Sequence, residues 1–236
     1  MRSKEIGNSS QTEKRLLRDM EVFYSPQFFM LFWNSIKMVL LILAGQLLVS
    51  VPAAWAFAVY KFPFRKILFT LYIVLMLMPF QVTMLSQYLV LSRVGVMNTH
   101  WAVILPAVFS TFPVFLIYRG FCGIPKGLLE AGRIDGLSEY GNYFRIALPL
   151  SKPSIATMTI FSFVAIWNDY MGPLIYFNST SKKTIQLGIK MFIGQYSTEY
   201  GLVMAASVLS LIPVLIIFLG GQKFFVQGIA SSGIKG

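Results

Sequence analysis

Long runs of apolar residues dominate the chain, and five of them are long enough to cross a bilayer. A spanning helix needs about 20 mainly apolar residues. The five runs are approximately Met38–Tyr60, Ile67–Leu91, Trp101–Phe121, Ser154–Phe177 and Gly201–Phe225. Each contains Gly or Pro, which membrane helices tolerate because neighbouring helices satisfy the freed backbone groups. The pattern predicts an all-α integral membrane protein with five transmembrane helices.

Composition supports this class and excludes several others. Of the 236 residues, 56% are apolar and 12% are charged, whereas about 25% of an average soluble domain is charged. One Cys and one His exclude a disulfide scaffold and argue against a metal centre or a Ser-His-Asp triad. We divide the chain into a polar and aromatic segment at 1–33, a transmembrane domain at 34–226 with a long loop at 122–153, and a tail at 227–236.

The net charge of +11 fits membrane topology better than nucleic-acid binding, because the cations are spread over short loops without a basic stripe. Ten Lys and Arg flank the predicted spans on one side, and five lie on the other. The positive-inside rule places the first set in the cytoplasm and residues 1–33 outside. That segment carries five further cations. Either an upstream helix is missing from this sequence, or the protein has five helices and a translocated basic tail.

The loop at 122–153 predicts two short helices around one turn. Pro125 suits a helix start, Gly136 a left-handed helix end, and Ser138 the cap of the next helix, which Pro149 limits. Leu128, Ala131 and Ile134 form an apolar stripe with i, i+3 spacing. An apolar stripe with small residues and capped ends is typical of a helix that sits in a partner's groove. A solvated linker is the alternative.

The same loop resembles the EAA loop of ABC-importer permeases, with the pattern E-A-A-x3-G-x9-I-x-L-P. The matching residues are Glu130, Ala131, Gly132, Gly136, Ile146, Leu148 and Pro149. Gly132 replaces the usual Ala, which lowers helix propensity by about 1 kcal/mol. Further motifs resemble the carbohydrate, maltose-type branch of this family, and the likeness covers roughly residues 30–236. They are Asn34-Ser35, Arg119 to Pro125, Ala165 to Asp169, Met204 to Ala206 and Gly233 to Gly236.

The resemblance implies a type I importer permease in the bacterial inner membrane, with one helix before the first span found here. It implies a second, similar permease subunit in a heterodimer, two ATP-binding subunits docked on the loop, and an extracytoplasmic solute-binding protein. The residues expected to couple the permease to the ATPases are Glu130, Ala131, Gly132, Arg133, Asp135 and Gly136. Within the loop, Glu130 and Arg133 offer an acid and a base for bonds across an interface. The chain contains no G-x-x-x-x-G-K-[ST] motif, so ATP and Mg²⁺ are expected on the partner ATPases and no enzyme activity on this chain.

One acidic residue, Asp169, lies inside a predicted span, where the family usually has Glu. A carboxylate in lipid is costly and usually faces a cavity or a partner. Trp167, Asn168 and Tyr170 beside it supply aromatic and hydrogen-bonding groups that suit a sugar, and Gln81 lies where Pro79 interrupts the second run. Asp169 and Asn168 either line a transport path or hold helices together by hydrogen bonds.

The sequence thus predicts the permease subunit of an ATP-driven importer for sugars or oligosaccharides. A permease for another small solute, such as glycerol phosphate or an amino acid, is the first alternative. A secondary carrier is the second, although carriers need several intramembrane charges and often internal repeats, and we find one acid and no repeat.

Overall fold

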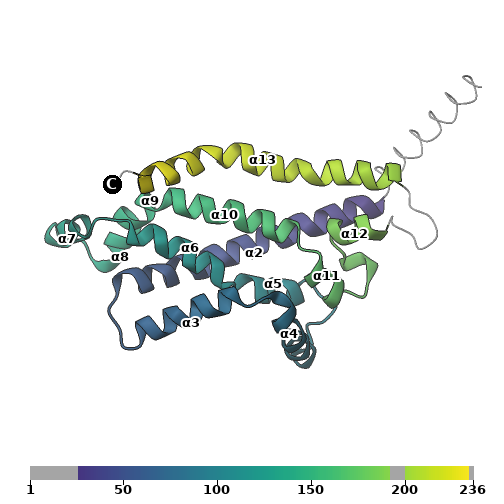
Figure 1. The fold of residues 1–236 in the computed structure, drawn as a ribbon, viewed down its shortest axis with the longest axis horizontal. Coiled ribbons are helices and arrows are strands. Elements are labelled where there is room, and N and C mark those ends of the chain that lie inside the picture. Colours follow the sequence, from purple (N-terminus) through teal and green to yellow (C-terminus); the bar gives the residue numbers. More distant parts are fainter. Residues whose placement is uncertain (1–25, 192–199, 234–236) are drawn as a thin grey trace, which may run out of the picture.

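The computed structural model describes residues 26–191 and 200–233, and the regular structure within these ranges is helical (Figure 1). The first half contains α2 (Pro26–Val59), α3 (Arg65–Leu77), α4 (Phe80–Val94), α5 (Trp101–Val108), α6 (Thr111–Cys122) and α7 (Lys126–Ile134). The second half contains α8 (Glu139–Gly141), the π-helical turn η1 (Asn142–Ala147), α9 (Leu148–Leu150), α10 (Lys152–Trp167), α11 (Met171–Tyr176), the 3-10 turn η2 (Thr180–Lys182), α12 (Ile185–Met191) and α13 (Tyr200–Gly233).

Several helices are long and apolar enough to cross a membrane, as predicted for an integral membrane protein. Gln27–Val59, Trp101–Cys122 and Val203–Gln222 are each long and apolar enough to cross a bilayer. Two bent helix pairs, Arg65–Leu77 with Phe80–Val94 and Glu139–Leu150 with Lys152–Trp167, raise the number in the described residues to five if each counts as one span. The all-α membrane fold is therefore confirmed.

Two predicted spans are not continuous, and another begins at a different residue. The second bends by 101° between α3 and α4, where Met78 is extended and Pro79 precedes α4. The fourth ends at Trp167 and resumes at Met171 after a break. The first begins earlier than predicted, at Pro26, so residues 26–33 belong to a helix and not to a separate segment. Residues 1–25 and 234–236 of the predicted end segments lie outside the described part.

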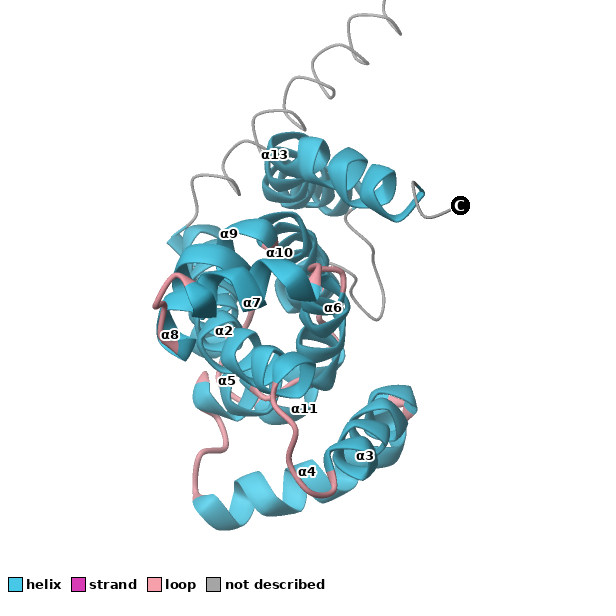
Figure 2. Cartoon of the chain, turned by 90° about the vertical axis from the view of Figure 1, so that its left-hand side faces the viewer, coloured by secondary structure: helices cyan, strands magenta, loops and turns pink. Residues whose placement is uncertain are grey.

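The centre of the bundle forms around α2, which packs against α5, α6 and α10, while α13 packs against α10. Trp55 of α2 contacts Phe121 of α6 with 5.3 Å between ring centroids. Trp167 of α10 stacks on Phe163 at 5.8 Å. Figure 2 shows α2, α5, α6 and α10 grouped together, with α3 and α4 to one side. This arrangement buries one face of α2 and leaves α3 and α13 on the periphery.

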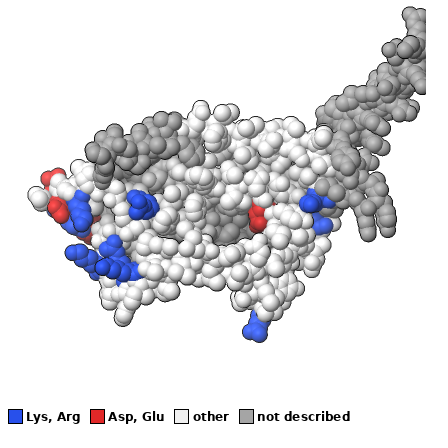
Figure 3. Space-filling model, viewed as in Figure 1, with Lys and Arg blue, Asp and Glu red and all other residues white. Residues whose placement is uncertain are grey.

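Exposed apolar side chains cover the peripheral helices. No residue of α3 is buried, and α13 exposes Leu211, Ile216 and Leu219 among others. A lipid-facing helix needs this surface, because hydrocarbon is its solvent. Figure 3 shows Lys and Arg toward the two ends of the long axis and at the tip of the lower projection, with one acidic patch on the face between them. The α7–α8 end, which we call the hairpin end, thus lies opposite the α12 end (Figure 1).

Candidate coupling hairpin and transport cavity

The first arm of the hairpin is α7, and its two ends follow the predicted signals. The helix begins directly after Pro125 and ends at Ile134. Gly136 has φ +82°, the left-handed conformation that glycine adopts at helix ends. Its N–H donates to the Arg133 carbonyl at 3.1 Å, and the Leu137 N–H donates to the Gly132 carbonyl at 2.9 Å. These two bonds form a Schellman motif, so the predicted helix end at Gly136 is confirmed.

The second arm begins as predicted but continues further. Ser138 Oγ accepts the Gly141 N–H at 3.2 Å, which caps the helix. The backbone then widens into the π-helical turn 142–147 and continues helically through Leu150. Pro149 therefore does not end this arm, because a proline near the start of a helical turn has no bond to lose. The bend to α10 follows at Ser151, whose hydroxyl makes no capping bond.

The two arms meet at Gly132, which is buried against the π-helical turn. A Cβ on Gly132 would collide with the side-chain oxygen of Asn142 and approach Ile146 Cδ1 to 2.7 Å. Asn142 is held in place because its side-chain amide donates to the Leu129 carbonyl at 3.3 Å. Glycine at 132 therefore permits close packing of the arms, a role that compensates for its weak helix propensity.

We expect Gly132→Val to loosen the hairpin, because overpacking a tight contact costs about 1–3 kcal/mol. Gly127→Val is the matched control, since a Cβ at Gly127 of the same helix meets nothing within 4 Å. Hydrogen–deuterium exchange of the segment 128–146 should accelerate at least about fivefold in the first variant and stay near wild type in the second. Equal exchange in both variants would contradict the packing role of Gly132.

The outer face of the hairpin is apolar and exposed. Leu128 and Ile134 of the predicted stripe are 46% and 85% exposed, and Ala131 between them is exposed. Tyr140 and Phe144 of the second arm are 78% and 63% exposed. Large apolar side chains exposed on both arms of a polar loop are typical of an interaction surface. We name Leu128, Ala131, Ile134, Tyr140 and Phe144 the hairpin face.

The charged residues of the hairpin lie on its surface. Arg133 Nε donates to Glu139 Oε1 at 2.8 Å, and the Arg133 side chain stays 46% exposed. The carboxylate of Glu139 holds the pKa of Arg133 above its usual range. Glu130 and Asp135 are exposed. The bond to Glu139 uses one of the five N–H groups of the guanidinium, so both residues of the predicted pair remain accessible to a partner.

Two adjoining cavities of about 450 and 460 Å³ lie where the start of α4 faces α5, α6 and the break after α10, and Asp169 borders both. They also share Phe80, Phe112, Val103, Ala107 and Ser110. Gln46 and Ser162 add polar groups to one cavity; Thr83, Gln87, Thr111 and Tyr176 add them to the other. Neither cavity is lined by a Lys, Arg or His among the described residues. Aromatic walls with a few hydroxyl and amide groups are typical of small-molecule sites.

Asp169 occupies the break between α10 and α11. Its Oδ1 accepts the Gly172 N–H at 3.2 Å, so it caps the first turn of α11. A Cβ on Gly172 would lie 2.7 Å from Asp169 Oδ2, so glycine permits this close approach. The same carboxylate borders both cavities, so both predicted alternatives, a path residue and a structural residue, stay open.

The other predicted path residues lie elsewhere. Trp167 is buried and donates its indole N–H to the Ser210 carbonyl of α13 at 2.9 Å. The Asn168 side chain donates to the Val164 carbonyl and accepts from Gln186 of α12. These bonds tie α10 to α12 and α13.

Tyr170 lies 5.8 Å from the Lys190 ammonium, measured to the ring centroid, and Gln81 is exposed on α4. Neither residue borders the two cavities. Of the five predicted path residues, Asp169 alone borders them.

Gln46 is a cavity residue that sequence reasoning missed. Its amide donates to the Ala107 carbonyl at 2.9 Å, while its carbonyl oxygen is buried without a partner in the described residues. An unpaired buried acceptor beside a cavity is available to a bound solute, since leaving it unsatisfied is costly. The signal was present, because Gln46 is the one amide in an apolar run that we predicted to cross the membrane.

Comparison with known proteins gives one family. The model of the family described as "Binding-protein-dependent transport system inner membrane component" matches residues 46–231. The arabinooligosaccharides transport system permease protein AraQ of Halalkalibacterium halodurans is 35% identical over 205 residues, which cover 87% of this chain and 74% of that protein. The lactose transport system permease protein LacG of Rhizobium radiobacter is 34% identical, covering 86% and 74%.

Two further similarities extend the range of named solutes. The sn-glycerol-3-phosphate transport system permease protein UgpE of Pectobacterium atrosepticum is 33% identical, covering 84% of this chain and 72% of that protein. A chain of a bacterial ABC transporter involved in the import of the acidic polysaccharide alginate superposes with a TM-score of 0.78 at 22% identity, covering 88% and 78%. At this identity the superposition supports the fold.

Proposed function

This chain belongs to the family of binding-protein-dependent transport system inner membrane components and is a permease of an ABC importer; we propose that its cargo is a neutral sugar or short oligosaccharide. The relatives named for sugars, arabinooligosaccharide and lactose permeases, support a carbohydrate. The choice between a neutral and an anionic solute needs the chemistry of the cavity, because other relatives are named for glycerol phosphate.

The observation that carries the proposal is the charge of the cavity lining. Asp169 is its one ionisable acid, and no cation lines either cavity in the described part of the chain. A carboxylate in a low-dielectric site repels an anion and accepts hydrogen bonds from hydroxyl groups. Gln46 supplies a second acceptor, and Phe80 and Phe112 supply apolar walls. Phosphate and uronate groups are therefore disfavoured on this side of the path.

The experiment is uptake by the assembled importer in proteoliposomes with ATP inside. Neutral oligosaccharides of arabinose, galactose or glucose should drive uptake and stimulate ATP hydrolysis. Glycerol phosphate and oligouronates are the anionic test solutes, and they should neither be taken up nor stimulate ATP hydrolysis. Uptake of an anionic solute above every neutral sugar would contradict the proposal and favour the second candidate, a glycerol phosphate permease.

We propose further that the hairpin face receives an ATP-hydrolysing subunit at the cytoplasmic side. The face exposes Ile134 and Leu128 beside Glu130, a composition that suits insertion of a short helix into a partner's groove. The cations concentrated around this end support a cytoplasmic orientation. In this scheme two ATPase subunits bind ATP and Mg²⁺, a second and different permease completes the path, and an extracytoplasmic binding protein delivers the sugar.

Ile134→Glu tests this surface. A carboxylate in the centre of an apolar interface removes a contact of about 2 kcal/mol, so we expect association with the ATPase subunit to weaken about 30-fold. The membrane fold should persist because the Ile134 side chain is 85% exposed. Ile134→Leu keeps the apolar contact and is the matched control. Co-purification of the ATPase with each variant measures the effect, and equal recovery from both would exclude Ile134 from the interface.

A further inference from the structure

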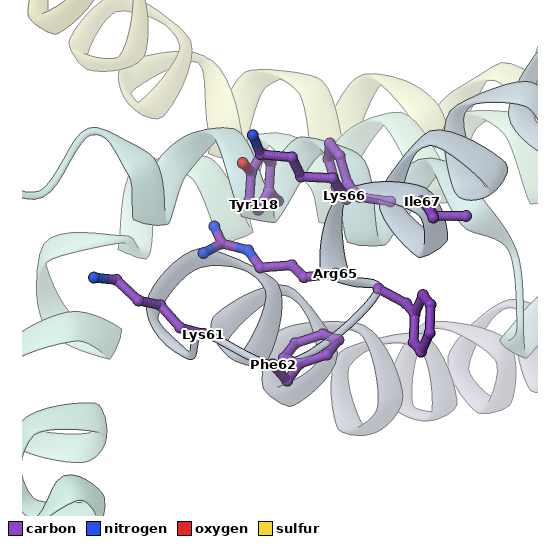
Figure 4. A pocket seen from close by; sticks show the side chains of 8 residues that line it. Lys61, Phe62, Arg65, Lys66, Ile67 and Tyr118 are labelled. Carbon is purple, nitrogen blue, oxygen red and sulfur yellow. The ribbon is translucent and has the colours of Figure 1, made fainter.

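A basic and aromatic pocket of about 770 Å³ lies at the hairpin end, where α2 passes into α3 (Figure 4). Its lining consists of Lys61, Phe62, Phe64, Arg65, Lys66, Ile67 and Phe69, with Tyr118 from α6. Figure 4 shows the charged ends of Lys61, Arg65 and Lys66 directed to the same side of the view as the Tyr118 hydroxyl, with Phe62 and Ile67 on the other side. Neither the hairpin face nor the Asp169 cavities include these residues.

The wall of the pocket is preorganised. Phe57 of α2 contacts Phe62 and Phe69 with ring centroids 5.8 and 5.5 Å apart, and Phe69 contacts Tyr118 with ring centroids 4.1 Å apart. The Arg65 guanidinium donates to the carbonyls of Tyr60 and Ala58 at 3.3 and 3.4 Å. These contacts fix the loop 60–64 against both helices before any ligand arrives.

The charge of the pocket is uncompensated. No acidic residue lines it, and among the described residues neither Lys61 nor Lys66 forms an ion pair. The two bonds to carbonyls occupy two of the five N–H groups that a guanidinium carries. Two ammonium groups and the remaining guanidinium N–H groups, beside a phenol, are the donors that bind a phosphate group.

The surroundings distinguish a lipid phosphate from one in solution. The pocket follows directly on a segment that is able to span the membrane, which ends at Val59. From its rim, α3 presents Ile67, Leu68 and Leu71 with 58%, 44% and 51% of their surfaces exposed. A soluble phosphate would make no contact with this apolar surface, whereas the acyl chains of a lipid would pack against it. Basic pockets beside membrane helices at the cytoplasmic side are suited to anionic lipid head groups.

We propose that this pocket binds the head group of an anionic phospholipid, with the phosphate at Lys61, Arg65 and Lys66 and the acyl chains along α3. This proposal does not depend on the proposed cargo, because it is tested by measuring lipid binding and not uptake. Since Tyr118 lies on α6 one turn before Cys122, a bound lipid would also brace the helix that leads into the hairpin.

Native mass spectrometry of the full-length protein in its importer complex tests the proposal with added phosphatidylglycerol or phosphatidylcholine. Lys61→Gln combined with Lys66→Gln should lower phosphatidylglycerol binding about 30-fold and leave phosphatidylcholine binding unchanged. Both side chains are exposed, so the fold is retained. Arg65 is left intact because it caps α2. Arg93→Gln with Lys152→Gln removes two exposed cations outside the pocket and should keep wild-type binding.

Further measurements in the same experiment distinguish a lipid from free phosphate, and loss of charge from misfolding. Lys61→Arg with Lys66→Arg should retain phosphatidylglycerol, which would tie the loss to charge and not to misfolding. Millimolar inorganic phosphate should leave the lipid bound; complete displacement would overturn the assignment to a lipid. Equal binding by the double Gln variant and wild type, or equal loss in the Arg93 and Lys152 control, would overturn the site itself.

Discussion

Gly136→Pro should abolish coupled transport while the membrane helices remain folded. Proline fixes φ near −65°, whereas Gly136 has φ +82°, and proline also lacks the N–H that donates to the Arg133 carbonyl. The combined cost is about 3 kcal/mol or more, which shifts the equilibrium of the hairpin more than 100-fold toward an open form. Uptake by the reconstituted importer and co-purification of the ATPase subunit should both fall to background.

Gly136→Asn is the matched control, because asparagine adopts the left-handed conformation and keeps the N–H. It should retain most of the uptake. Circular dichroism should give the same helix content for both variants, since the turn lies outside the spans. Wild-type uptake by the proline variant would show that the Schellman turn is dispensable and would remove the hairpin from the coupling path.

The hairpin was predictable because its signals are local. Gly136 and Ser138 each act through the backbone within four residues, so sequence spacing alone locates the turn and the cap. The exposed stripe of Leu128, Ala131 and Ile134 follows from helical periodicity in the same way. The close contact of Gly132 with Asn142 was not predictable, because it depends on how the π-helical turn folds back on α7.

The shape of the spans was less predictable, because hydropathy measures how apolar a segment is and not its direction. Pro79 indicated an interruption, but the 101° bend at this point depends on how α4 packs. The break after Trp167 was not predicted, since Asn168 and Asp169 also occur in continuous helices. It is held by a tertiary bond, in which Asn168 accepts from Gln186, and by a local bond, in which Asp169 accepts the Gly172 N–H three residues further on.

The same bonds explain why Asp169 alone of the predicted path residues borders the cavities. Trp167 is the last residue of α10, and residues 168–170 form the break before α11, so helical periodicity did not indicate which of these side chains face the cavities. Trp167 and Asn168 turn toward α12 and α13. The cavity is instead completed by Gln46 of α2 and Phe112 of α6, which are distant in sequence and meet only through packing.

Asp169→Asn should reduce uptake of a neutral sugar by roughly 10- to 100-fold, because a hydrogen bond to a charged group contributes about 1.5–3 kcal/mol. Asparagine keeps an oxygen that accepts the Gly172 N–H, so the cap of α11 is preserved. The variant removes the one charge from the cavities. Assembly of the importer, measured by co-purification of all subunits, should therefore remain at the wild-type level while transport falls.

Asn168→Ala is the structural counterpart of this variant. It removes the bonds to Val164 and Gln186 without touching the cavities, so we expect it to lower thermal stability of the complex and leave the apparent affinity for sugar unchanged. The two variants separate the roles, because one changes the path and the other changes the packing of α10 on α12. If Asp169→Asn instead lost assembly before transport, capping of α11 would be the function of Asp169, and the neutral-sugar proposal would lose the charge on which it depends.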